Sequence, residues 1–166
     1  MSNVLASDSI DLHAYFLGTW QFNRTIQTSE SALIGSAEGI AHFDEQANAD
    51  HLYYHETGKL LLAADARVIS FSKRFDYLLE APGALHVVFA DGPQAGESYQ
   101  HYQFDPQHHA LLPVNIHICV ADHYNGSYQL LDDDHFDLHT RIDGPHKDYV
   151  VLTHFSKVVA VTAFQA

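Results

Sequence analysis

Short runs in which apolar and polar residues alternate follow one another along almost the whole chain, and this feature constrains the fold most. Alternation with a period of two places successive side chains on opposite faces of a β-strand. Strands are expected at 19–27, 37–44, 51–57, 66–72, 74–81, 84–91, 98–105, 114–124, 127–132, 134–142 and 148–159. So many strands in close succession predict an antiparallel meander, which closes into a barrel or folds into a sandwich because open edges invite aggregation.

Turn residues between the runs support this interpretation. Pro82-Gly83 has the proline and glycine that a type II turn favours, and Gly144-Pro145 breaks the chain between two strands. Asn125-Gly126 tolerates positive φ angles and predicts a two-residue hairpin turn. Helix is expected only at Ser9–Leu17, with Ser7 or Ser9 as the N-cap. The sequence therefore predicts an all-β protein with one short N-terminal helix.

Size and charge narrow the classes of function. A chain of 166 residues fits one domain, here 1–166. The net charge of −13 disfavours binding to nucleic acid and to anionic membranes. The N-terminus lacks the pattern of a signal peptide, and Cys119 is the single cysteine, so we expect a cytoplasmic protein without an internal disulfide. The oligomeric state stays open, with a dimer as one option.

The stretch FLGTWQFNRTI, Phe16–Ile26, resembles the start of the calycin superfamily, which includes lipocalins and fatty-acid-binding proteins. The resemblance rests on a short helix followed by Gly18-Thr19-Trp20. It implies an up-and-down barrel whose tryptophan lies at the floor beneath a basic residue of the last strand, for which Lys157 is the candidate. The same stretch, with YYHETG, HICVADHY and GPHKDY, also resembles a bacterial family of uncharacterised barrel domains.

An arginine on the tryptophan face suggests a polar group inside the barrel. By alternation, Arg24 shares its face with Trp20 and Phe22, and Glu56 shares a face with Tyr54. A buried charge is costly unless it is paired. We therefore expect Arg24 and Glu56 to form a polar anchor in an aromatic pocket.

The main hypothesis is a cavity that binds a small, partly apolar ligand with a polar or anionic end. Its expected apolar lining is Trp20, Phe22, Tyr54, Tyr77 and Phe89. Its expected polar groups are Arg24, Glu56, His101, His117 and Tyr124.

Two alternatives use the same barrel. An enzyme of isomerase or hydratase type could use His117 with Asp122, or His101 with Tyr124, as an acid–base pair. A haem or metal carrier could use His101 and His117 as an interior pair. The sequence identifies neither a cofactor nor a catalysed reaction.

Overall fold

A computed structural model describes residues 9–115, 117–119 and 122–159, with only the backbone described at 117–119. The single helix, α1, spans Leu12–Phe16. The strands are β1 Gly18–Thr28, β2 Leu33–Glu45, β3 His51–Leu62, β4 Val68–Ala81, β5 Ala84–Phe89, β6 Ser98–Asp105, β7 Ala110–Pro113, β8 His117–Cys119, β9 Asp122–Asp132, β10 His135–Asp143 and β11 Asp148–Lys157.

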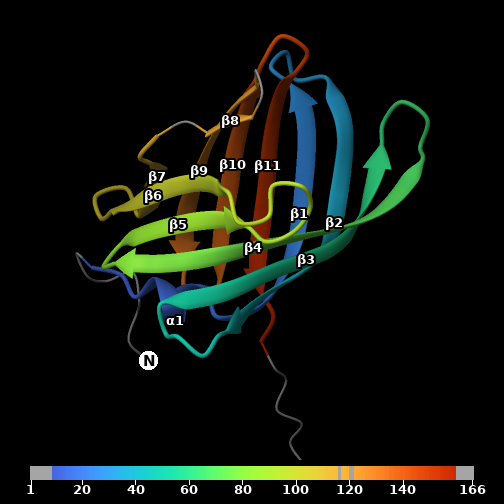
Figure 1. Cartoon of the computed structure of the whole chain (residues 1–166). Coiled ribbons are helices and arrows are strands. Elements are labelled where there is room, and N and C mark those ends of the chain that lie inside the picture. The colour runs from blue at the N-terminus through green and yellow to red at the C-terminus, as the bar shows by residue number, and fades with distance from the viewer. Residues whose placement is uncertain (1–8, 116, 120–121, 160–166) are drawn as a thin grey trace, which may run out of the picture.

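The strands form a closed antiparallel barrel, as the sequence predicts (Figure 1). Neighbours from β1 to β7 pair in chain order, β7 and β8 both pair with β9, and β9 pairs with β10. Closure comes from β11, which lies between β10 and β1. No helix in the described part of the chain is long and apolar enough to cross a bilayer.

The helix lies across one end of the barrel, which we call the closed end (Figure 1). Its N-cap is Asp11, whose carboxylate accepts a hydrogen bond from the Ala14 amide at 3.0 Å, so the serine caps expected from the sequence are wrong. Trp20 Nε1 donates to the Phe16 carbonyl at 2.8 Å. Lys157 Nζ lies 4.9 Å from the Trp20 ring centroid, in the arrangement that the family resemblance implies.

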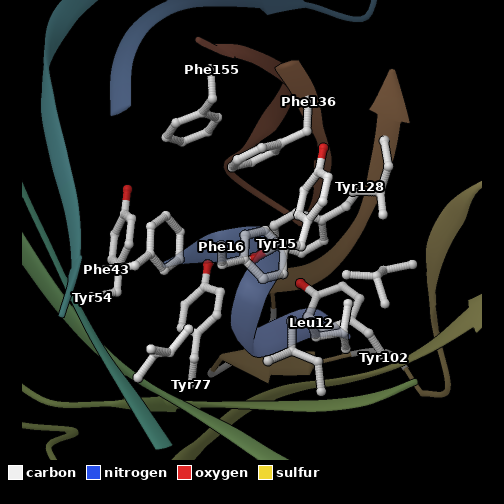
Figure 2. Packing of buried hydrophobic residues seen from close by; sticks show 14 of the residues in the cluster. Leu12, Tyr15, Phe16, Phe43, Tyr54, Tyr77, Tyr102, Tyr128, Phe136 and Phe155 are labelled. Carbon is white, nitrogen blue, oxygen red and sulfur yellow. The ribbon is translucent and has the colours of Figure 1, made fainter. Parts of the chain in front are cut away.

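Aromatic side chains fill the closed end. Figure 2 shows Tyr15 and Phe16 of α1 in the middle of this cluster, surrounded by side chains from the strands. Phe136 stacks on Phe155 with ring centroids 4.4 Å apart, and the hydroxyls of Tyr77 and Tyr128 hydrogen-bond at 2.6 Å. This half of the interior is a close-packed core.

The hairpin turn expected at Asn125-Gly126 is wrong. Both residues lie within β9 and pair with Arg141 and Thr140 of β10. A Cβ at Gly126 would lie 3.2 Å from the Tyr102 hydroxyl. The glycine therefore serves close packing inside the barrel instead of a turn.

Strand boundaries differ from the prediction in two other places. The runs at 66–72 and 74–81 belong to one long strand, β4. The single strand expected at 114–124 is replaced by β8 and the start of β9, and β7 was not expected. The turn at Pro82-Gly83 is confirmed, since Ala81 pairs with Ala84 and Gly83 has a φ of 73°.

Candidate functional site

Exposure of inward-facing residues increases along the barrel away from α1. On β4, Tyr77 is 4% exposed, Phe75 is half-buried and Lys73 is exposed. On β9, Tyr128 is buried and Tyr124 is half-buried. Because these side chains belong to the inner face by alternation, solvent enters this half of the barrel. We call it the open half, and it is the candidate binding site.

An ion pair marks the boundary between the packed core and the open half. Arg24 Nη1 and Nη2 each donate to a separate carboxylate oxygen of Glu56, both at 2.9 Å. The Arg24 side chain is 11% exposed and that of Glu56 is 2% exposed. This bidentate geometry is the strongest form of an arginine–carboxylate contact. The pairing expected from the sequence is confirmed.

The strand between them explains how these two side chains meet. Arg24 is on β1 and Glu56 on β3, with β2 between them. The inward positions of β2 there are Ala37, Gly39 and Ala41, which pair with Arg24, Phe22 and Trp20 of β1. A Cβ at Gly39 would lie 2.8 Å from Phe22 Cζ. Small residues on the middle strand thus leave room for a contact across it.

Neighbouring groups satisfy most of the remaining hydrogen-bonding capacity of the pair. Arg24 Nε donates to Thr153 Oγ1 at 2.8 Å, and the Tyr54 hydroxyl donates to Glu56. The Arg24 guanidinium also lies 4.9 Å from the Phe22 ring centroid. Burial by itself would raise the pKa of Glu56, but the hydrogen bonds and charge of Arg24 outweigh it and hold that pKa below its usual value. The carboxylate is therefore ionised at neutral pH.

Lys73 is a second cation in the open half. It pairs in register with Glu56 and lies on the inner face of β4 between Phe71 and Phe75. Its ammonium has no hydrogen bond or ion pair within the described part of the chain. Enclosure by the barrel, and then the charge of Arg24, lower its pKa, while Glu56 and Asp91 act in the opposite direction. Lys73 thus feels nearby carboxylates at a distance, but both oxygens of Glu56 are engaged by Arg24.

Lys73 was not among the site residues expected from the sequence, although the sequence carries a signal for it. Tyr77 was assigned to the interior, and the same alternation along β4 assigns Phe75, Lys73 and Phe71 to it as well. Phe75 lies 5.5 Å from Phe89 and 5.5 Å from Tyr99, measured between ring centroids. These three aromatic residues form the wall of the open half beside Lys73.

The expected apolar lining divides between the two halves. Trp20 and Phe22 are fully buried, and Tyr54 and Tyr77 are 4% exposed, so these four residues form the floor instead of an accessible wall. Phe89 and Tyr124 lie in the open half and are half-buried. The Tyr124 hydroxyl accepts a hydrogen bond from Lys147 at 3.2 Å.

His101 does not face the interior, so this part of the expected lining is wrong. It pairs with His86, and the two rings stack 3.8 Å apart, whereas the alternate pair Leu85 and Tyr102 belongs to the core. Regular alternation with the buried Tyr102 therefore turns His101 outward, whereas a β-bulge precedes it in β6: Val87 pairs with Gln100 and Val88 with Ser98, so Tyr99 is an extra residue. The bulge lets Tyr99 reach the aromatic wall, so Tyr99 and His101 lie on opposite faces although they are two residues apart.

The outward position of His101 also affects the two alternative functions, an enzyme and a haem or metal carrier. His101 cannot act with Tyr124 or form an interior histidine pair, because it lies on the other side of the sheet. The side chain of His117 lies outside the described residues. Asp122 forms an ion pair with Lys147 at 3.1 Å between Nζ and Oδ2.

Solved structures show the same fold. S-type phycobiliprotein lyase CPES from Guillardia theta matches with a TM-score of 0.64 and 8% identity, over 90% of this chain and 92% of that chain. A protein of unknown function of the DUF3598 family from Nostoc punctiforme matches with a TM-score of 0.54 and 10% identity, over 95% of this chain and 52% of that chain. At these identities the likeness concerns the fold alone.

Sequence comparison gives the family. A search of curated proteins found no match. The sequence profile of DUF6314, a family of unknown function, matches residues 16–157, which is most of the chain. The chain therefore belongs to the DUF6314 family of unknown function.

Proposed function

We propose that the open half of the barrel binds a small molecule with an apolar, ring-containing body and an anionic group. The observation that carries this proposal is Lys73, an inward-facing ammonium without a partner in the described structure, beside an ion pair that is already satisfied. An anionic ligand that entered beside the aromatic wall would meet this ammonium directly and would not have to displace a carboxylate partner.

The surroundings of Lys73 support an apolar body. Phe75, Phe89 and Tyr99 contact one another and are all half-buried, so they offer ring faces to a ligand without having to leave a packed core. Apolar walls with a few placed polar groups are typical of small-molecule sites. Arg24 supports the site indirectly, because its charge is committed to Glu56.

This proposal changes the role that the sequence suggested for Arg24. A ligand anion would have to compete with the Glu56 carboxylate for the guanidinium, and removing that partner from a buried pair costs about 3–5 kcal/mol. Contact with Lys73 carries no such cost. The anion therefore binds at Lys73, and the Arg24–Glu56 pair holds β1, β3 and β11 in place around it.

Two fluorescent probes test the proposal. 8-Anilinonaphthalene-1-sulfonate carries an aromatic body and an anion, and N-phenyl-1-naphthylamine carries a similar body without the charge. We expect both to bind the native protein. Lys73→Met should weaken the sulfonate at least tenfold and leave the neutral probe within twofold, because only the charge contact is lost.

Controls make the result specific to the pocket. Lys59→Met removes an exposed lysine on the outer face of β3 and should change neither affinity. Phe89→Ala should weaken both probes. Circular dichroism checks that each variant is folded. The proposal would be contradicted if the wild type and Lys73→Met bound the sulfonate equally well. It would also be contradicted if Lys59→Met weakened sulfonate binding as much as Lys73→Met does.

A further inference from the structure

Three side chains with metal-ligating atoms meet on the outer face of the barrel, away from the proposed pocket. They are Glu80 of β4, His86 of β5 and His101 of β6, so each comes from one of three adjacent strands. Their ligating atoms all lie within 4.8 Å of one another. Although the chain has fourteen histidines, this is the one such trio of His, Cys, Asp or Glu in the part of the chain that the structure describes.

Strand register brings the three residues together. His86 pairs directly with His101 across β5 and β6, and with Leu78 across β4 and β5. Glu80 is two residues beyond Leu78, where the pairing of β4 with β5 is irregular, and its carboxylate reaches His86. Residues in direct register on antiparallel strands have Cβ atoms about 4.5–5.5 Å apart, which suits two imidazoles that share one ion.

Distances within the trio suit a tetrahedral ion. His86 Nδ1 lies 3.2 Å from Glu80 Oε1. Two ligands at about 2.0 Å from a tetrahedral zinc ion are roughly 3.3 Å apart, so this pair already has the required spacing. His101 stacks on His86 with 14° between the rings and has to rotate to direct a nitrogen at the ion.

A hydrogen bond outside the trio supports the same arrangement. His86 Nε2 lies 2.9 Å from Ser98 Oγ, so the second ring nitrogen has a partner and Nδ1 is directed toward Glu80. Metal-ligating histidines usually have such a partner on the other nitrogen, which fixes the ring orientation. Two imidazoles and one carboxylate are the ligand set of a zinc-class ion and do not suit Mg²⁺ or Ca²⁺, which prefer oxygen.

We propose that Glu80, His86 and His101 form a binding site for a divalent transition metal of the zinc class, with water completing the coordination. The ion joins β4, β5 and β6 from the outside. The inner faces of the same strands carry Phe75, Phe89 and Tyr99, so the metal stabilises the wall of the pocket without contacting it. The site stands independently of the ligand proposed above.

Zinc titration of the untagged, chelator-treated protein tests the site. With a competing chromophoric indicator, we expect one zinc ion per chain at micromolar or lower Kd. His101→Ala should weaken that binding at least tenfold, and Glu80→Gln should weaken it less. Co²⁺ in place of zinc should give visible absorption bands that His101→Ala abolishes.

A second histidine pair provides the matched control. His42 and His55 also pair in direct register, on β2 and β3, and stack with ring centroids 4.9 Å apart, but they belong to no such trio. His55→Ala should leave zinc affinity within twofold of the wild type. The proposal is overturned if His101→Ala binds zinc as tightly as the wild type, or if His55→Ala weakens binding as much as His101→Ala does.

Discussion

The two halves of the barrel interior have the same backbone architecture and opposite contents. Near α1, inward positions carry rings that pack on one another, such as Phe16, Phe136 and Phe155, and solvent does not reach them. At the other end, inward positions carry Lys73 and half-buried rings. The comparison shows that strand alternation decides which residues face inward, whereas the size of the side chains and the plug formed by α1 decide whether the interior is solid or open.

The largest difference between the halves should be in stability. Phe136→Ala removes a fully buried ring with close aromatic neighbours and should lower the free energy of unfolding by about 3–5 kcal/mol. Phe89→Ala, in the open half, should cost less than about half of that, because its ring is already in contact with solvent. Denaturant unfolding of both variants measures the two values. Equal losses would contradict the division into a packed and an open half.

The second largest loss of stability is expected from mutating the Arg24–Glu56 pair at the boundary between the halves. Glu56→Gln leaves the Arg24 charge buried without its counter-ion and should cost about 3 kcal/mol in unfolding free energy. Replacing both partners by apolar residues, Arg24→Met with Glu56→Leu, should restore part of this loss, because no charge stays buried. A double variant that is less stable than Glu56→Gln would show that the pair itself stabilises the fold.

Acid unfolding sharpens this test. The pKa of Glu56 is lower in the folded chain than in the unfolded chain, so its stabilising contribution is complete above about pH 4.3. That contribution is lost as the pH falls through the folded-state pKa. As the pH is lowered from 5, the free energy of unfolding should therefore fall less for Glu56→Gln than for the wild type. Parallel curves would exclude Glu56 as a contributor to acid unfolding.

The smallest expected effect compares two lysines. The pKa of Lys73 is lowered, mainly by its enclosure, whereas a hydrogen bond to Tyr124 and then one to Asp122 raise the pKa of Lys147. At pH 8 a larger fraction of Lys73 is neutral, so limited acetylation should modify it several-fold faster than Lys147. Peptide mass spectrometry gives the two rates. Faster modification of Lys147 would contradict the environment assigned to Lys73.

Much of the fold follows from local pattern, and the errors have identifiable physical causes. Alternating residues and turn residues predicted the barrel. The same alternation placed Arg24 and Glu56 on inward faces and so predicted their contact, because β1 and β3 are regular there. The hairpin turn at Asn125-Gly126 was predicted wrongly, because a glycine that is needed for close packing looks the same in the local sequence as a glycine in a turn.

The candidate site was harder to predict because its faces depend on tertiary structure. Strict alternation puts His101 on the same face as Tyr99, but a bulge in β6 between them sends the two side chains to opposite faces, and local sequence does not reveal a bulge. Whether an inward residue lines a hollow or a core was also inaccessible, since it depends on how deeply α1 and its neighbours fill the barrel.

The extra residue in β6 links the two proposed sites. Deleting Tyr99 would make the pairing with β5 regular, and it would also remove a ring from the pocket wall and change the spacing between Ser98 and His101. A single-residue deletion at this point would therefore disturb both proposed sites, even though they lie on opposite sides of the sheet.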